Sequence, residues 1–179
     1  MPRTRSRVFV SVGRGAFARP PFAERPVSPP PSYGVPTEGG ELMPWSFVIE
    51  QLERARNYWV VTVGRRETPH SAPVWGVFVS DDLFFETSPT TRKARNLARN
   101  PAAVVHTESG DDVVIVEGQA RVFSPTREVA AQIARTFAHK YDGYQPDPAE
   151  WTEGALYRVE PSAVFAWRDM PTATCWRFR

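Results

Sequence analysis

The residues that first suggest chemistry lie in the stretch ETSPTTRKARNLARNP, residues 86–101. It holds four basic residues, Arg92, Lys93, Arg95 and Arg99, and no acidic residue lies between the first and the last of them. The hydroxyl and proline residues in front of them predict a turn that leads into a short helix, from about Thr91 to Arg99, which Pro101 ends. Arg92 and Lys93 therefore fall in the first helical turn.

Cations in the first turn of a helix are unfavourable. A helix N-terminus carries about half a positive charge and unpaired N–H groups, so Arg92 and Lys93 are destabilising there unless an anion compensates them. A bound phosphate would remove this conflict and would use the same N–H groups. The alternative is a solvated basic helix beside a hairpin, without a ligand. The pattern favours the phosphate site, because hydroxyl groups and cations are concentrated at one end of the helix.

The elements that would position this site are mostly strands. Runs of β-branched and aromatic residues predict strands over 58–63, 71–79, 83–87, 102–107, 112–123, 156–159, 163–167 and 173–178. Helical periodicity predicts two longer helices, over 43–57 and 126–141, and residues 141–154 have the composition of a loop. Many closely spaced strands with few helices predict a mainly β fold with flanking helices (α+β), built as a small barrel.

Composition divides the chain into a tail and one domain. Residues 1–40 hold eight of the 18 prolines and six Arg against Glu24 and Glu38, without apolar periodicity. We expect this segment to be a disordered tail, which leaves residues 41–179 as a single domain with a sizeable core. The tail has a net charge of +4 and the domain one of −2, so the domain lacks the basic excess that nucleic-acid binding requires.

Other functional classes find little support in the sequence. The three histidines lack the spacing of a metal motif, so no metal site is predicted. The acid pairs at 81–82 and 111–112 are expected to be turn residues and not a catalytic carboxylate pair. No nucleotide-binding loop or nucleophile elbow is present, and no apolar run is long enough to span a membrane. With a single cysteine, Cys175, and no signal-peptide core, we expect a cytoplasmic protein.

Four segments together resemble a known family. Residues 85–93 are similar to the phosphate-binding signature of the pyridoxamine 5'-phosphate oxidase-like split β-barrel flavoproteins, in which an aromatic residue, a Thr and a turn precede a hydroxyl residue, Arg and Lys. The other three segments are PHSAPVWGVFV (69–79), similar to the flavin-flanking strand, RKARNLARNPAAVV (92–105), and VVIVEGQARV (113–122), similar to the long central strand. The resemblance covers about residues 44–179 and implies a dimeric split β-barrel.

This resemblance also implies where a flavin-type cofactor would bind. The residues that would hold its phosphate are Thr87, Thr91, Arg92 and Lys93. The residues that would flank its ring, mostly through backbone groups, are Pro73, Val74 and Trp75. We expect most of the other tryptophans to pack, and Trp167 and Trp176 are similar to the C-terminal strand that reaches across the dimer interface in this family.

Two departures from the family pattern bear on the reaction. Val113 stands where the vitamin B6 oxidases have a flavin-binding Gln, and their C-terminal substrate signature is not visible. The run K-x-R-N-L, residues 93–97, is similar instead to actinobacterial oxidoreductases that use FMN or coenzyme F420. The resemblance thus implies a homodimeric oxidoreductase that transfers a hydride to or from a small conjugated or heterocyclic substrate, with no catalytic residue identified. The alternative is a non-catalytic flavin or haem carrier or sensor on the same barrel.

Overall fold

The computed structural model describes residues 15–18, 22–26, 34, 36, 40–151 and 155–178. Its strands are β1 (Ala23–Glu24), β2 (Tyr58–Val63), β3 (Pro69–Val74), β4 (Gly76–Val79), β5 (Asp82–Glu86), β6 (Ala102–Thr107), β7 (Val113–Val122), β8 (Leu156–Trp167) and β9 (Thr174–Arg177). Its helices are α1 (Trp45–Arg54), α2 (Arg92–Leu97), α3 (Arg127–Lys140) and α4 (Pro148–Trp151), with short 3-10 turns η2 (Arg65–Glu67) and η3 (Met170–Thr172). The fold is therefore mostly antiparallel sheet with few helices, as the sequence predicts.

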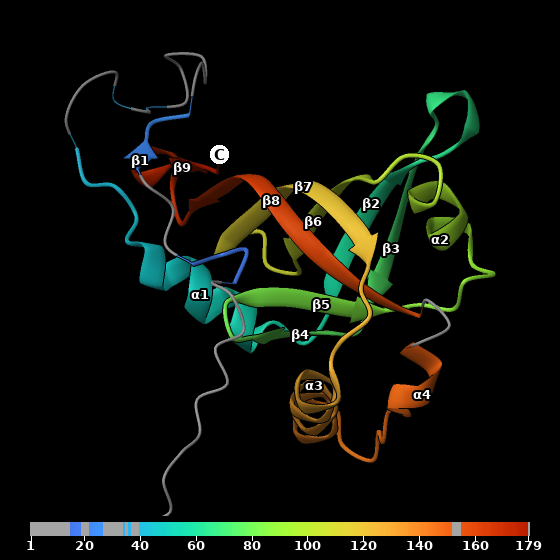
Figure 1. Cartoon of the computed structure of the whole chain (residues 1–179). Coiled ribbons are helices and arrows are strands. Elements are labelled where there is room, and N and C mark those ends of the chain that lie inside the picture. Colours follow the sequence, from blue (N-terminus) through green and yellow to red (C-terminus); the bar gives the residue numbers. More distant parts are fainter. Residues whose placement is uncertain are drawn as a thin grey trace, which may run out of the picture.

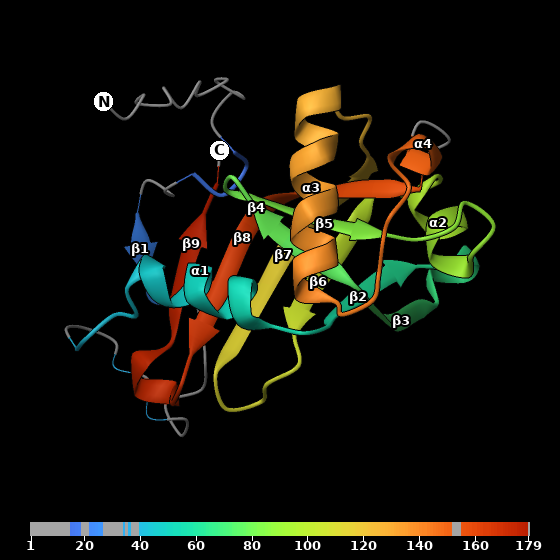
Figure 2. The same cartoon turned by 90° about the horizontal axis from the view of Figure 1, so that it is seen from below.

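The strand pairings follow one path from β3 to β4, and the chain itself closes this path into a ring. β3 pairs with β2, β2 with β6, β6 with β7, β7 with β8, β8 with β5 and β5 with β4, all antiparallel. Because only Trp75 separates β3 from β4, the last strand returns to the first. Figure 1 shows β4 and β5 crossing beneath β6, β7 and β8, and Figure 2 shows α1 and α3 on that same lower side.

The predicted strand boundaries agree best with the observed ones where the apolar pattern of the sequence is strongest. The predictions over 58–63 and 102–107 match β2 and β6 residue for residue. The predicted strand over 71–79 is wrong in being continuous, because it breaks at Trp75. The two strands predicted over 156–159 and 163–167 are one strand, β8, since Pro161 lies opposite an irregularity of β7 where its missing N–H is tolerated.

Two groups of buried side chains stabilise this arrangement. The larger fills the ring, and Phe47 and Leu52 of α1 contribute to it. The smaller lies between α3 and strands β4 and β5, where Ile133, Phe137 and Tyr141 are fully buried. The every-fourth-residue spacing of these three side chains predicts the buried face of α3, and burying each contributes about 1.5–3 kcal/mol. Of the described helices, none combines the length and the apolar character that crossing a bilayer requires.

The N-terminal segment corrects one prediction. Phe17 is completely buried and packs edge-on against Phe78, with ring centroids 5.5 Å apart. The N–H of Ala16 donates to the carboxylate of Asp82 (2.7 Å), which also forms an ion pair with Arg158 (2.9 Å). The prediction of a disordered tail over residues 1–40 is therefore wrong for residues 15–18, because a single aromatic ring fills a pocket in the core.

Residues 22–26 also contact the domain. Ala23 and Glu24 pair with β9, and Glu24 accepts a hydrogen bond from Arg177 (2.7 Å). Arg25 donates to the carbonyl of Pro171 at 2.6 Å. The remaining positions of the predicted tail, apart from residues 34, 36 and 40, lie outside the described residues. Main-chain pairing and the side chain of Arg25 thus attach residues 22–26 to the domain. Composition alone does not indicate this attachment.

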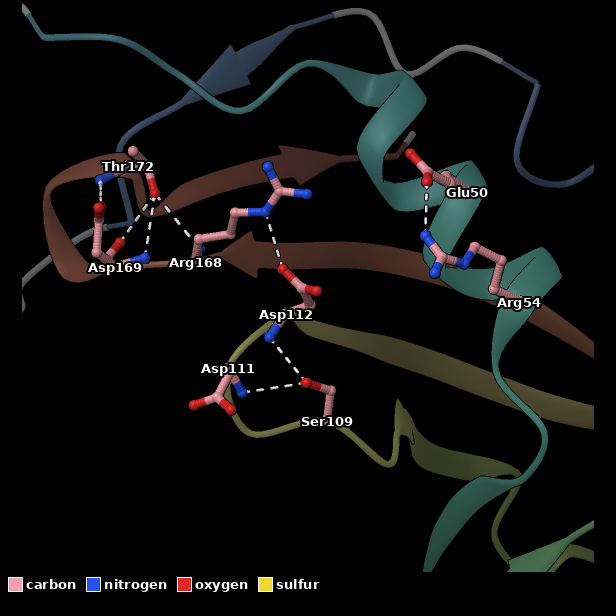
Figure 3. Close-up of polar contacts among 8 residues, drawn as sticks. All are labelled: Glu50, Arg54, Ser109, Asp111, Asp112, Arg168, Asp169 and Thr172. Carbon is pink, nitrogen blue, oxygen red and sulfur yellow. Dashed lines mark hydrogen bonds and ion pairs between the residues drawn. The ribbon is translucent and has the colours of Figure 1, made fainter.

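The acid pair at 111–112 has the structural role that the sequence predicts. Both backbone N–H groups donate to the hydroxyl of Ser109, at 3.1 and 2.8 Å, which forms the turn between β6 and β7. The carboxylate of Asp112 forms an ion pair with Arg168 (2.8 Å), as Figure 3 shows. Nearby, Asp169 caps the short η3 turn by accepting from the N–H of Thr172 (3.0 Å). These polar groups stabilise the ends of strands.

Candidate functional site

The turn before α2 brings two of the predicted phosphate-binding hydroxyls together. The Oγ1 atoms of Thr87 and Thr91 lie 3.0 Å apart. Thr91 is the N-cap of α2: its hydroxyl accepts from the N–H of Ala94 (3.3 Å) and donates to the carbonyl of Ser88 (2.9 Å). The hydroxyl of Thr91 therefore already stabilises the turn, as N-cap residues commonly do. Thr87 is buried at 8% exposure.

A cationic cluster forms where β3 meets α2. Burial lowers the pKa of His70, on β3, and the positive charges of Arg92 and Lys93 lower it further. The Nδ1 atom of His70 is buried and has no hydrogen-bond partner within the described residues. Burial also lowers the pKa of Lys93. We call His70, Arg92 and Lys93 the cationic cluster, and a phosphate placed there would offset all three charge effects.

The side chain of Arg92 faces a second feature. A surface hollow of about 690 Å³ is lined by Arg65, Arg92, Arg95, Asn96, Ala98 and Arg99. Its four arginines come from η2 and from α2 with the turn that follows it, and we call this feature the arginine hollow. The sequence predicts the α2 arginines but not Arg65, which the fold brings close from 27 positions away.

Thr87 lines a different cavity, beside Trp75. This cavity of about 480 Å³ is lined by Trp75, Glu86, Thr87, Ser88, Pro89, Tyr144 and Ala155. The carboxylate of Glu86 accepts hydrogen bonds from Tyr144 and Trp151, which both follow α3 in the chain. Thr87 therefore borders the cavity of Trp75, while its hydroxyl reaches Thr91 directly before Arg92, which lines the arginine hollow.

Trp75 occupies the break between β3 and β4. Its ring is 42% exposed, stacks on Tyr141 with centroids 4.5 Å apart, and meets the edge of Tyr144 at 5.4 Å. The two residues before it alternate in direction: Pro73 is exposed, whereas Val74 is buried at 6% exposure. Of the three predicted ring-flanking residues, Trp75 and Pro73 are therefore accessible through their side chains, and Val74 packs into the core.

The backbone beside Trp75 is held by a network that sequence reasoning missed. The Tyr141 hydroxyl accepts from the N–H of Gly76 (2.8 Å) and lies 2.7 Å from the carbonyl of Arg56, to which it can donate. Lys140 donates to the carbonyl of Gly76 (2.9 Å) and to the hydroxyl of Tyr58 (3.0 Å). We call Tyr58, Gly76, Lys140 and Tyr141 the Gly76 network. Its only sequence signal is Tyr141 at the end of the helical repeat, which predicts packing and not a hydrogen bond.

Burial shapes the charges of the Gly76 network. Burial lowers the pKa of Lys140 to about 8, and it raises the pKa of both Tyr58 and Tyr141. Gly76 itself tolerates no side chain, since a Cβ there would lie 2.6 Å from the carbonyl oxygen of Phe84. The segment that carries Trp75 is therefore fixed by close packing and by hydrogen bonds from two neighbouring side chains.

A row of side chains crosses the outer face of the sheet from Pro73. In register, it runs through Pro73, Trp59, His106, Ile115 and Phe165 on β3, β2, β6, β7 and β8. Trp59 is 37% exposed and stacks against the ring of His106, so it is an exception to the expectation that most tryptophans pack. Strand alternation explains this, because Tyr58 and Val60 point inward and Trp59 must point outward. Among the described residues, no three His, Cys, Asp or Glu side chains are arranged to hold a metal ion.

Solved structures resemble this fold at low sequence identity. A conserved hypothetical protein from Mycobacterium tuberculosis has a TM-score of 0.59 and 19% identity, over 76% of this chain and 91% of its own. An F420 reductase has a TM-score of 0.50 and 22% identity, over 64% and 93%. A heme binding protein from Mycobacterium smegmatis has a TM-score of 0.55 and 15% identity, over 76% and 59%. At these identities the likeness concerns the fold alone, and no curated protein matches the chain.

A family comparison is more specific. The family model of pyridoxamine 5'-phosphate oxidase matches residues 48–168, which include all seven predicted cofactor residues. That range begins in α1, contains the cationic cluster, the arginine hollow and the Gly76 network, and ends after β8. Since it spans well over half of the sequence, this chain belongs to the pyridoxamine 5'-phosphate oxidase-like family.

Proposed function

We propose that this protein is a homodimeric split β-barrel oxidoreductase that binds a flavin-type cofactor, FMN or coenzyme F420. It transfers a hydride to or from a small conjugated or heterocyclic substrate. The observation that carries the proposal is the cationic cluster: Arg92 and Lys93 stand at the start of α2, their charges act on His70, and the buried Nδ1 of His70 has no hydrogen-bond partner among the described residues. Such a set of groups fits a phosphate, because each gains a charge-assisted hydrogen bond from an anion.

The residues divide into two roles. Lys93, Arg92 and the hydroxyls of Thr87 and Thr91 hold the phosphate, with His70 beside them. Pro73, Val74 and Trp75 flank the ring. The cofactor supplies the hydride chemistry when it is bound, and the protein binds, orients and shields it. We assign no catalytic residue.

Orientation depends on the Gly76 network. Lys140 and Tyr141 hold both polar groups of the Gly76 backbone, directly after Trp75. Tyr141 and Tyr144 support two sides of the indole ring. A ring-flanking segment fixed in this way keeps its carbonyl and N–H groups in one place, which reduces the entropy lost on binding. Trp75 also limits the access of water to whatever lies beside it.

The outer face of the sheet supports the proposed dimer. The row of Trp59, Ile115 and Phe165 is apolar and only partly buried in a single chain. In Figure 1 the described helices α1, α3 and α4 lie beneath the strands that carry this row. A second copy on this face would bury the row and would bring a neighbour close to Pro73 and Trp75. This arrangement suits a cofactor bound between subunits.

The second candidate is a non-catalytic flavin or haem carrier or sensor. It is favoured by the fold shared with the heme binding protein from Mycobacterium smegmatis. A carrier would bind the cofactor without catalysing its oxidation. Turnover of reduced cofactor with a panel of electron acceptors therefore separates the two candidates, since a carrier leaves the background oxidation rate unchanged.

Identification of the cofactor tests the proposal. Small molecules released from the purified protein are analysed by mass spectrometry, and the apoprotein is titrated with FMN and with coenzyme F420. We expect one of the two to bind with a dissociation constant in the micromolar range or below, and light scattering to give a dimer. Failure of both cofactors to bind would overturn the proposed function, and full cofactor binding by a monomer would overturn the dimer.

A further inference from the structure

We propose that the cavity beside Trp75 selects planar rings that carry a positive charge, and that Glu86 determines this selectivity. The cavity has a volume of about 480 Å³, and of the described residues that line it Glu86 alone is charged. Its role as the place of a substrate rests on the proposed function, whereas its preference for one sign of charge depends only on its own residues.

Trp75 provides a flat wall for such a ring. Tyr141 covers one face of the indole, with the ring planes 13° apart and the centroids 4.5 Å apart, and Tyr144 meets the edge at 70°. Trp75 nevertheless remains 42% exposed and lines the cavity, so a ligand ring can stack on the face that Tyr141 leaves open. The face of an aromatic ring is electron-rich and attracts cations, and among side chains Trp does so most strongly.

Glu86 places a carboxylate in the same cavity. It is the last residue of β5, and its side chain accepts hydrogen bonds from the hydroxyl of Tyr144 and from the indole N–H of Trp151. Trp151 is buried at 1% exposure, so the donor that α4 contributes is held in place by packing. Both of these donors are neutral. They therefore orient the carboxylate without cancelling its negative charge.

The hydroxyls at the rim of the cavity bond to one another. The Oγ1 atoms of Thr87 and Thr91 lie 3.0 Å apart, and the hydroxyls of Ser88 and Thr90 lie 2.9 Å apart. A ligand in the cavity therefore meets chiefly an aromatic face and one negative charge, the combination with which proteins recognise organic cations. In a partly enclosed space this attraction is stronger than in bulk water, and the same carboxylate repels an anion.

The charge of Glu86 is opposite to that of the cationic cluster. Arg92 and Lys93 attract the phosphate of the proposed cofactor, whereas Glu86 attracts a cation on the other side of Thr87. A ligand with the wrong charge is unfavourable at either place. Two charges of opposite sign thus direct the cofactor phosphate and a cationic ring to different parts of the site.

Binding of three bicyclic probes tests the selectivity. N-methylquinolinium is a permanent cation, quinoline is neutral near neutral pH, and quinoline-2-carboxylate is an anion. The purified wild type is titrated with each probe by calorimetry at low ionic strength. We expect N-methylquinolinium to bind about tenfold or more tightly than quinoline, and quinoline-2-carboxylate to bind more weakly than either. Equal affinities for the cation and the neutral ring would overturn the inference.

Two variants separate the charge from the aromatic wall. Glu86→Gln removes the charge but keeps an acceptor oxygen, so the preference for the cation should fall below about twofold while quinoline binds as it does to the wild type. Trp75→Leu keeps the charge but removes the stacking face, and should weaken N-methylquinolinium binding about fivefold or more. The control is Glu50→Gln, which removes an exposed acid on α1 and should keep the wild-type preference. A preference that survives in Glu86→Gln, or that Glu50→Gln also abolishes, would contradict the assignment.

The cofactor shows whether the cavity belongs to a substrate. The wild type, saturated with whichever of FMN and coenzyme F420 it binds, is titrated again with N-methylquinolinium. Unchanged or tighter binding supports a substrate cavity beside the cofactor. Loss of cation binding on addition of the cofactor would mean that the cofactor itself fills the cavity, and would overturn the inference. If neither cofactor binds but the preference for the cation holds, the proposed function fails and the selectivity of the cavity stands.

Discussion

The Gly76 network holds one cation, Lys140, and the arginine hollow holds four, and the two regions treat their cations in opposite ways. In the Gly76 network, Lys140 donates to a carbonyl and a hydroxyl and lies 4.6 Å from the centre of the Tyr58 ring. In the arginine hollow, the guanidinium groups have one hydrogen bond to Asn96 and no ion pair within the described residues. A polar group with partners inside the chain stabilises the fold, whereas a cluster without them is available to a ligand.

The largest expected effect lies in the docked N-terminal segment. Like the Gly76 network, this segment has its contacts inside the chain. Phe17→Ala removes a completely buried ring that contacts Phe78 and Phe178. We expect the free energy of unfolding to fall by about 3–5 kcal/mol, from lost burial and the cavity left behind. Denaturant unfolding followed by intrinsic fluorescence measures this change. The exposed Phe22, at 76% exposure, provides the control Phe22→Ala, which should change stability by less than about 0.5 kcal/mol. Similar values for both variants would show that residues 15–18 do not dock.

Removal of one hydroxyl tests the Gly76 network. Tyr141→Phe keeps the ring that supports Trp75 but leaves the N–H of Gly76 without its partner. An unsatisfied buried donor costs about 1–3 kcal/mol, so the variant should lose that much stability. Thermal and denaturant unfolding measure it. A loss below about 0.3 kcal/mol would mean that the hydroxyl does not hold this backbone.

Lys140 gives the network a pH dependence. Its pKa of about 8 in the folded chain lies below the value near 10.5 of an unfolded lysine. Between about pH 8 and pH 9.5 the unfolded chain therefore keeps a proton that the folded chain has released, and stability rises with pH. Relative to Lys140→Met, the wild type should gain about 1 kcal/mol over this window, a value reduced for partial solvent screening. A constant difference between the two proteins across these pH values would contradict the assignment.

The smallest expected effect lies in the arginine hollow. Arg92→Ala and Arg95→Ala remove charges that repel their neighbours in the ligand-free protein. We expect the stability of each apoprotein to change by less than about 0.5 kcal/mol, with Arg92→Ala neutral or stabilising by a few tenths. Melts of the apoproteins at low salt measure it. Destabilisation by more than about 1 kcal/mol would show that these arginines stabilise the fold, as Lys140 does.

Local sequence patterns were sufficient for most of the fold and for part of the site. Apolar alternation predicts β2 and β6 in full, and the capping role of Thr91 follows from its place before the helix. These features depend on neighbours within a few residues. The sequence gives no sign of the break at Trp75, where the N–H of the next residue, Gly76, donates to the hydroxyl of Tyr141, 65 positions away.

Tertiary contacts explain the remaining differences. The composition of residues 1–40 predicts disorder, and one phenylalanine in that segment gives no sign of the pocket that Phe78 and Phe178 form around it. In the site, the sequence groups Arg92 with Thr87 and Thr91, but it gives no sign that Arg65 lines the same hollow as Arg92. The sequence therefore predicted which residues belong to the site better than it predicted which of them lie together.

Cofactor titration of Lys93→Ala and Arg92→Ala, paired with melts of the same apoproteins, tests the central claim most directly. If these cations bind the phosphate of a flavin-type cofactor, affinity for FMN or coenzyme F420 should fall about ten- to a hundredfold in each variant. The apoproteins should melt close to the wild type, and Arg135→Ala on α3 should change neither property. Apoproteins that melt much lower while their cofactor affinity stays at the wild-type value would contradict the account, because α2 would then be a structural helix and not a binding element.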